Sequence, residues 1–439
     1  MEGRNLLQEF TVYTNGKYSA SGFLTEDTEE EEMRLLRLYP EQTDQRWGGF
    51  GGAVTDSAAY VWSRMAGAQR QELIDAYFSP AGLNYSLVRV PLDSCDFSLE
   101  PYEAAPDGDL ARFDVSRPLR YILPMLEAIR KTRAVSLLLS PWSPPAAFKS
   151  NGARQRGGKC LPEYREAWAE YLCRYVQVFR DLGFPVFGLT LQNEPHATQP
   201  WDSCRWTAEE ERAFLVDHVK PALLRHGLAE VEVYCWDHNK ERVLDRSLAV
   251  LAGEGRDCAA GVAFHWYSGD HFAALRQVHR LFPEKKLLLS EHCVDRLIVA
   301  GGGQARRDKI AHELLGDIEC GTSCIFDWNL LLDGQGGPNY VENYCHAPFL
   351  YQEETRTLVR QDTYEAYWHL AHFLAPGDER ILSSSFSPQI EATAFRRAAG
   401  GIVLALRNSG EATALKVSLE GKLAALEVPA GALVTAVMH

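Results

Sequence analysis

Two glutamates stand where apolar segments end, and they are the residues of this chain best suited to covalent chemistry. Glu194 lies in the segment Leu191-Gln192-Asn193-Glu194-Pro195, and Glu291 lies in Leu288-Leu289-Ser290-Glu291-His292-Cys293. Apolar runs of this length are typical of buried strands. Carboxylates at the carboxyl ends of such strands occupy the catalytic face of an α/β barrel. A pair of them indicates a retaining glycosidase, in which one carboxylate is the nucleophile and the other is acid and then base.

The electrostatics of such a pair support this interpretation. Mutual repulsion and burial are expected to raise the pKa of one glutamate and so provide a proton donor. The structural alternative is an ion pair with a buried arginine. Arg89, at the end of the second expected strand, could pair with one glutamate but does not easily explain both. We therefore interpret the glutamates as catalytic and Arg89 as a residue that orients the nucleophile.

Aromatic and polar side chains gather near the same strand ends. Flat rings cover the apolar C–H faces of sugars, although core packing explains a lone tryptophan better. Several rings at the ends that carry the glutamates favour a sugar pocket. The aromatic candidates are Trp142, Trp266, Tyr267 and Trp328, and the polar candidates are Asp96, Asn193, Asp327 and Asn343. His265 is either a satisfied core histidine or a partner of the nucleophile.

Eight apolar strands alternate with helical segments from about Trp47 onward. In the segments between the strands, apolar residues recur three and four apart, as in amphipathic helices. The strands are expected at Phe50–Val54, Ser86–Leu92, Val135–Pro141, Val186–Gln192, Val231–Trp236, Gly261–Tyr267, Lys286–Ser290 and Ser323–Leu330. Eight alternations predict an α/β fold of the (β/α)8 barrel type. The structural alternative is an open doubly wound sheet, which usually carries a glycine-rich phosphate-binding loop. The glycines of Gly48-Gly49-Phe50-Gly51-Gly52 match neither the G-x-G-x-x-G nor the P-loop spacing of such loops.

The pattern changes after about Ala375, where short strands are separated by glycine turns. Such strands are expected at Phe386–Phe395, Gly401–Arg407, Ala412–Leu419 and Ala432–Met438, and near the N-terminus at Glu9–Tyr13 and Tyr18–Phe23. We expect them to form a side β-sandwich built from both chain termini. The predicted division is 1–40 for N-terminal strands of the sandwich, 41–375 for the catalytic barrel and 376–439 for the rest of the sandwich.

The length, the net charge and the apolar segments of the chain argue against nucleic acid and membranes as its main partners. The chain has 439 residues, which suits a large barrel with a smaller module. Its formal net charge of −14 disfavours nucleic acid or an anionic membrane as the main partner. The residues after Met1 have no apolar core like that of a signal peptide, and no stretch approaches the length of a membrane span. We therefore expect a cytoplasmic protein without stable membrane insertion; the sequence does not predict its oligomeric state.

The ten cysteines and the histidines do not indicate a metal centre. The cysteines are scattered through apolar segments, which favours reduced, buried thiols. Cys320-x-x-x-Cys324 lacks the companion ligands of a zinc site. A metal-dependent hydrolase using His265, Asp327 and Cys293 would need these residues to converge, which their spacing does not require. We expect no metal and no cofactor.

Taken in order, the motifs resemble glycoside hydrolase family 30, in the branch typified by glucosylceramidases. Asn-Glu-Pro alone occurs in many glycosidase families, but the ordered set from about Tyr39 to His372 is highly specific. The matching segments are Gly49–Asp56, Val88–Pro91, Ser94–Ser98, Ser140–Pro145, Gln192–Pro195, His265–Tyr267, Ser290–Cys293, Asp327–Leu330 and Gly336–Asn339.

The resemblance implies a barrel with a side sandwich, retention of the β-anomeric configuration and no cofactor. It implies that Glu194 is the acid/base and Glu291 the nucleophile. Asn193 would hold the 2-hydroxyl group of the sugar. Sugar binding is implied for Asp96, Trp142 and Trp328, with Asn343 on the rim. Support of the nucleophile is implied for Arg89, His265, Tyr267 and Cys293. Of these, His265 and Tyr267 are also candidate sugar contacts.

We therefore expect a retaining, exo-acting β-glycosidase that hydrolyses β-glucosides. The alternatives are a β-xylosidase, or a hydrolase of β-1,6-glucan or another oligosaccharide. A non-catalytic carbohydrate-binding protein would have lost one of the two glutamates, and both are present. Glu342, His196, His292 and the segment Trp201–Cys204 depart from the glucosylceramidase pattern where an aglycone would lie. These departures favour soluble β-glucosides over ceramide glucosides.

Overall fold

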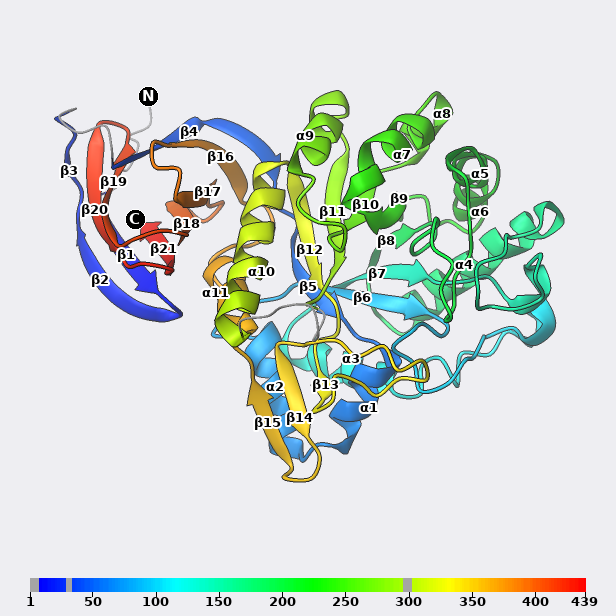
Figure 1. Cartoon of the computed structure of the whole chain (residues 1–439). Helices are drawn as coiled ribbons and strands as arrows, with labels where there is room; N and C mark the ends of the chain where they lie inside the picture. The colour runs from blue at the N-terminus through cyan, green and yellow to red at the C-terminus, as the bar shows by residue number, and fades with distance from the viewer. Residues whose placement is uncertain (1–7, 29–33, 295–301) are drawn as a thin grey trace.

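The structure, a computed structural model, describes residues 8–28, 34–294 and 302–439. Figure 1 shows a β/α barrel beside a curved sheet in which the two ends of the chain, blue and red, lie together. The predicted (β/α)8 barrel with a side module built from both termini is confirmed.

All eight expected barrel strands are present, and they close in the expected order. Each pairs in parallel with the next, and the last strand pairs with the first. The strands are β5 (Gly49–Ala53), β6 (Leu87–Leu92), β7 (Ser136–Pro141), β8 (Val186–Thr190), β9 (Glu232–Asn239), β10 (Gly261–His265), β11 (Lys286–His292) and β12 (Thr322–Asp327). Their carboxyl ends therefore meet at one mouth.

The glycines of β5 are explained by the closeness of its neighbours. A Cβ on Gly51 would lie 2.4 Å from the carbonyl oxygen of Leu87, and one on Gly52 would lie 2.3 Å from a methyl group of Leu330. Any larger side chain would push β5 away from β6. These glycines allow the first barrel strand to close the sheet, and the absence of a phosphate loop is consistent with this role.

Helices surround the barrel and bury the apolar faces that their periodicity predicts. In α4 (Arg165–Asp181), the residues Trp168, Leu172, Tyr175 and Phe179 recur at helical spacing and are all buried. The expected helix Ala208–His226 is α5 (Ala208–Ala213), one π-helical turn (Phe214–Val219) and α6 (Lys220–Arg225). The others are α1 (Asp56–Arg64), α2 (Gly67–Phe78), α3 (Ile122–Thr132), α7 (Val243–Val250), α8 (Glu254–Cys258), α9 (Phe272–Leu281), α10 (Gly302–Glu319) and α11 (Thr363–Ala371).

The side module is a sheet of ten strands in the order β2-β1-β21-β18-β17-β16-β4-β19-β20-β3. Its strands are β1 (Glu9–Thr14), β2 (Lys17–Phe23), β3 (Thr25–Glu26), β4 (Leu35–Arg46), β16 (Glu379–Ser385), β17 (Ile390–Arg396), β18 (Ile402–Asn408), β19 (Thr413–Leu419), β20 (Lys422–Val428) and β21 (Leu433–Met438). The expected strand Phe386–Phe395 is wrong at its start, because a turn at 386–389 separates β16 from β17. The domain division stays a prediction; β4 runs across its first boundary.

A short sheet follows the last barrel strand and positions the rim of the mouth. It consists of β13 (Leu332–Asp333), β14 (Phe349–Gln352) and β15 (Thr357–Arg360). The segment between β13 and β14 reaches the loop after β6, where the backbone N–H of Tyr340 donates to the carbonyl oxygen of Ser98 at 3.1 Å. This segment carries Asn343 and Cys345.

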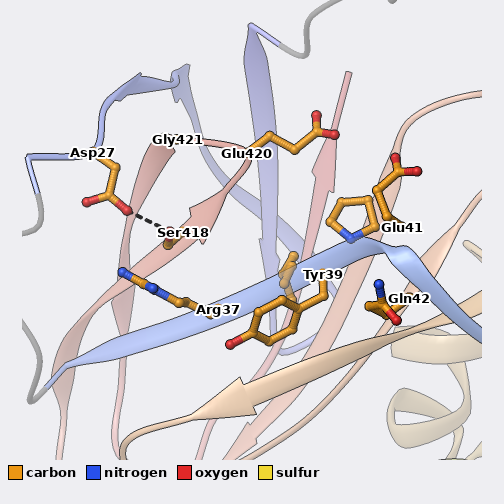
Figure 2. A pocket seen from close by; sticks show the side chains of 10 residues that line it. Asp27, Arg37, Tyr39, Glu41, Gln42, Ser418, Glu420 and Gly421 are labelled. Atoms are coloured by element: carbon orange, nitrogen blue, oxygen red, sulfur yellow. Dashed lines mark hydrogen bonds between the residues drawn. The ribbon is translucent and has the colours of Figure 1, made fainter.

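A hollow of about 360 Å³ lies on the side sheet, between β4 and the turn after β19. Figure 2 shows Arg37, Tyr39 and Gln42 along β4, with Glu420 above them. Ser418 Oγ donates to Asp27 Oδ2 at 2.6 Å. The hollow contains no residue of the barrel mouth, so the chemistry predicted from the sequence does not belong to it.

All ten cysteines fall within the described residues, and all are unpaired. Every one except Cys258 is buried. Buried thiols are as expected from their apolar sequence context.

Candidate active site

The carboxyl ends of the barrel strands open into a cavity of about 320 Å³. Both glutamates line it, and so do the other residues that the sequence predicted for the site, with the exception of Arg89, His265, Trp266 and Asp327. The lining residues are Asp96, Trp142, Asn193, Glu194, Gln199, Trp201, His238, Asn239, Tyr267, Glu291, Cys293, Trp328, Asn343 and Cys345. The volume and the mixture of aromatic and polar groups are those of a small-molecule site.

Glu291, near the end of β11, is held at both carboxylate oxygens. Arg89 Nη1 donates to Oε2 at 2.6 Å, and the hydroxyl group of Tyr267 donates to Oε1 at 3.0 Å. Arg89 projects from β6 and is fully buried below the cavity. The position and rotation of the Glu291 carboxylate are therefore fixed by two donors, one in β6 and one just after β10.

Asp237 shares the same guanidinium, and the sequence interpretation missed it. Arg89 Nη2 donates to Asp237 Oδ2 at 2.9 Å and to Asn193 Oδ1 at 2.9 Å. Asp237 is the extra residue of a bulge, because Trp236 pairs with Ala263 while His238 pairs with Phe264. Burial alone would raise the pKa of Asp237, but the charge of Arg89 and the hydrogen bond from His265 outweigh it and lower that pKa.

His265 lies between three carboxylates at the base of the site. Its Nε2 is 3.1 Å from Asp237 Oδ1, and its Nδ1 is 3.4 Å from Glu194 Oε1 and 3.9 Å from Glu291 Oε1. Burial opposes the charged imidazolium, but the carboxylates outweigh it and raise the pKa of His265 to about 9. His265 is completely buried and does not line the cavity. It is placed to support the carboxylates from below rather than to contact a sugar.

The expected rise in carboxyl pKa falls on Asp96 and not on Glu194. For Glu194, burial would raise the pKa, but His265 and His238 outweigh it and lower that pKa. For Asp96, burial and the charges of Glu291 and Glu194 all act in the same direction and raise the pKa well above its usual range. The group beside Glu194 whose protonated form these contacts favour is therefore the imidazole of His265.

Two tryptophans form a flat surface on one side of the cavity. The rings of Trp142 and Trp328 stack with centroids 5.3 Å apart at an interplanar angle of 20°. The guanidinium of Arg89 lies 5.0 Å and 5.6 Å from these two ring centroids, at cation–π distance. Phe97 packs edge-on against Trp328 with centroids 5.8 Å apart. The rings are thus held rigidly by their neighbours.

The rim and the base contain the remaining candidates. Asn343 Nδ2 donates to Asp96 Oδ2 at 3.0 Å, which joins the rim segment to the loop after β6. Cys293 Sγ is 3.6 Å from the hydroxyl oxygen of Tyr267. Trp266 and Asp327 are not at the cavity, so their proposed sugar contacts are wrong: Trp266 Nε1 donates to the Cys293 carbonyl oxygen at 2.9 Å, and Asp327 accepts from Tyr367 at 3.1 Å.

The family assignment agrees with this geometry. Residues 47–374 match the family model described as the glycosyl hydrolase family 30 TIM-barrel domain. The chain belongs to glycosyl hydrolase family 30. It is therefore a glycoside hydrolase, and the matched residues include both glutamates and all of the cavity.

Relatives of this family 30 enzyme include glucosylceramidases and a glucanase. The mouse lysosomal acid glucosylceramidase is 29% identical over 408 residues, which cover 88% of this chain and 79% of the relative. The solved structure of SrfJ from Salmonella typhimurium has a TM-score of 0.94 at 32% identity and covers 98% of this chain and 99% of that one. A solved endo-β-1,6-glucanase has a TM-score of 0.88 at 25% identity and covers 98% and 99%.

No helix among the described residues has the length and apolar content needed to cross a membrane. The mouse relative is named as a lysosomal enzyme, and that location is stated for the mouse protein alone. The cytoplasmic location of this family 30 enzyme stays a prediction.

Proposed function

We propose that this family 30 enzyme is a retaining, exo-acting β-glycosidase that acts on β-glucosides. The observation that supports the proposal best is the fixed carboxylate of Glu291, bound by Arg89 and Tyr267 and facing the same cavity as Glu194. A nucleophile held in this way meets the anomeric carbon of a bound sugar with little reorganisation.

In the first step, Glu291 attacks the anomeric carbon and Glu194 gives a proton to the departing glycosidic oxygen. The bond between the sugar and the aglycone breaks, and an ester between the sugar and Glu291 forms. The proton comes from the pair formed by His265 and Glu194, whose facing atoms are 3.4 Å apart. Asp237 accepts from the far side of His265 and keeps the imidazole oriented.

In the second step, Glu194 acts as base. It removes a proton from a water molecule, and the resulting oxygen attacks the anomeric carbon while the ester bond to Glu291 breaks. The sugar leaves with its original β configuration, and the proton returns to Glu194 and His265. Two inversions at one carbon give net retention.

The shape of the cavity supports action at the end of a chain. The hydrogen bond between Asp96 and Asn343 joins two loops across the rim, and the stacked rings of Trp142 and Trp328 bound the cavity beside it. Asn193, held by Arg89, is positioned for the 2-hydroxyl group. A cavity of about 320 Å³ is at the small end of the range for ligand sites, which favours one terminal sugar over a long chain.

A second candidate function is hydrolysis of β-1,6-linked glucan. It is favoured by further polar and aromatic side chains that line the same cavity, which are Gln199, Trp201 and Asn239. These groups suit a second sugar better than a lipid chain. The solved structure that is similar over 98% of this chain is named as an endo-β-1,6-glucanase, an enzyme that acts on β-1,6-glucan.

The test is a panel of aryl β-glycosides (glucoside, xyloside, galactoside and fucoside), run with wild type and Glu291→Gln in parallel. We expect fastest turnover of the glucoside, its loss in the variant, and first release of β-glucose by proton NMR. Release of α-glucose would contradict retention, and turnover by the variant near the wild-type rate would contradict the role of Glu291.

Natural substrates distinguish the two candidates. β-1,6-Linked glucan and its disaccharide are compared with glucosylceramide in detergent micelles. Glucose as the sole product from the glucan supports exo action, whereas larger oligosaccharides would show that the enzyme cleaves inside the chain. Preference for the glucolipid over both sugars would contradict the soluble-substrate proposal.

A further inference from the structure

Three potential metal ligands converge beside the catalytic cavity. Ligand atoms of Glu194, His238 and His265 all lie within 4.8 Å of one another, and no other group of three His, Cys, Asp or Glu side chains within residues 8–28, 34–294 and 302–439 meets at this spacing. His265 Nδ1 is 3.4 Å and His238 Nδ1 is 3.6 Å from the same oxygen, Oε1 of Glu194. Both nitrogens are buried, and among the described residues neither has a hydrogen-bond partner of good geometry.

We propose that Glu194, His238 and His265 form an inhibitory binding site for one Zn²⁺ or a similar divalent transition-metal ion. Two imidazole nitrogens and one carboxylate oxygen are a typical zinc ligand set. Tetrahedral ligands with bonds of about 2.0–2.1 Å lie roughly 3.4 Å apart. Two of the three pairs already have nearly this separation. The fourth position faces the cavity, which Glu194 and His238 line, so a water molecule or a sugar hydroxyl can complete the coordination.

The surroundings of the two rings favour metal binding through Nδ1. His265 Nε2 is 3.1 Å from Asp237 Oδ1, and Asp237 is itself bound by Arg89. A carboxylate behind a ligating histidine fixes the tautomer and the ring orientation of the metal ligand. His238 packs on the ring of Trp236 with centroids 5.0 Å apart, which restricts its rotation. Little rearrangement is therefore needed to bring the ligands together.

Occupancy of this site would block acid/base chemistry. The ion takes the place of the proton between His265 and Glu194 and coordinates the carboxylate oxygen that must donate and accept protons. Inhibition would be reversible, because a chelator competes for the ion. The inhibition arm of the test depends on the proposed function, whereas the binding arms do not.

Binding is measured with ZnCl2 by calorimetry and with CoCl2 by the visible ligand-field absorption of bound Co²⁺. We expect one high-affinity ion per wild-type chain and binding at least tenfold weaker in both His238→Gln and Glu194→Gln. His226→Gln is the matched control, because His226 faces Glu170 on the surface and has no part in the cluster. Melting curves verify that each variant is folded, and Glu194→Gln decides the result if His238→Gln is unfolded.

The inhibition arm uses the best aryl substrate. We expect Zn²⁺ to inhibit wild type, a chelator to restore turnover, and His238→Gln to need at least tenfold more Zn²⁺ for half inhibition. Equal affinity in wild type and both cluster variants would overturn the proposal, and so would equal sensitivity of wild type and His238→Gln to Zn²⁺. If no substrate is turned over, the proposed function fails while calorimetry and the Co²⁺ spectrum still decide whether the site exists.

Discussion

Arg89 donates to Glu291 at 2.6 Å from a position that no solvent reaches, and the same guanidinium binds Asp237 at 2.9 Å. One buried cation thus compensates two carboxylates. It also connects the middle of β6 with the carboxyl-terminal parts of β9 and β11. Because a buried charge that loses its partner is strongly unfavourable, this ion triplet stabilises the arrangement of the strands that carry it.

We predict that Arg89→Met, which keeps the approximate volume, removes the guanidinium that Glu291 and Asp237 share and leaves the imidazole of His265 to face both carboxylates. Loss of one partner from a buried ion pair costs roughly 3–5 kcal/mol, so the free energy of unfolding should fall by about that amount. Urea denaturation of the variant measures it, and kcat/KM for the aryl glucoside should fall at least 100-fold. Arg64→Met is the control, because Arg64 makes an exposed pair with Glu353, and such pairs contribute about 0–1 kcal/mol. Equal stability of both variants would refute the argument.

Glu194→Ala should slow substrates in proportion to their need for protonation. An activated aryl leaving group departs with little help from an acid, whereas an alkyl or sugar alkoxide requires a proton. We expect kcat/KM to fall by two or more orders of magnitude more for a β-1,6-linked disaccharide than for a nitrophenyl glucoside. The measurement is a series of glucosides with leaving groups of graded acidity. Equal losses across the series would show that Glu194 is not the acid.

His369 should make the stability of the fold depend on pH. Its Nε2 accepts the backbone N–H of Gly16 at 2.8 Å and its Nδ1 donates to Thr435 Oγ1 at 2.9 Å, so the ring is neutral where β1 and β21 meet α11. Burial lowers the pKa of His369 to about 3. In an unfolded chain the pKa is about 6.5, so between these values the unfolded state binds the extra proton. Stability is therefore lost as the pH falls below about 6.5, by roughly 1.4 kcal/mol per pH unit.

The check is urea denaturation of wild type and His369→Gln at pH values from 7 down to 4. The variant should be the less stable protein at pH 7, and the difference should shrink as the pH falls because only wild type carries this titration. His271→Gln, which removes an exposed histidine at the start of α9, is the matched control. A constant difference for His369→Gln would mean that the pKa of His369 is the same in the folded and the unfolded protein.

The barrel and the two glutamates could be predicted because they follow local patterns. Apolar runs indicated all eight strands, and Glu194 and Glu291 stand at their ends, where barrel chemistry takes place. Arg89 and Tyr267 were recognised for the same reason. Four strands of the side sheet were missed: β3 has only two residues, both polar, and the polar outer faces of β4, β16 and β20 dilute the apolar pattern.

Asp237 and His238 were missed because backbone irregularities place them. Asp237 is a bulge residue with φ of 48°, and Ser290 is the extra residue where β11 leaves register with β10. If β9 alternated regularly, the side chains of Asp237 and His238 would point in other directions. The amino-acid sequence does not indicate where a bulge occurs. Extending the fifth expected strand beyond Trp236 would have been enough to include both as candidates. The raised pKa of His265 was missed for a related reason, since it depends on carboxylates that lie on or follow three other strands, those of Asp237, Glu194 and Glu291.

Tyr267→Phe isolates the second donor to Glu291. The hydroxyl group donates to Glu291 Oε1 at 3.0 Å, and hydrogen bonds to charged groups are worth about 1.5–3 kcal/mol. If this bond positions Glu291 for attack, kcat should fall roughly 10- to 150-fold while KM changes little. Tyr344→Phe, on the exposed rim outside the lining of the cavity, should keep wild-type kinetics. Both variants should melt near the wild-type temperature, because neither tyrosine is buried. A Tyr267→Phe variant with wild-type kcat would show that Arg89 alone is sufficient to hold the Glu291 carboxylate.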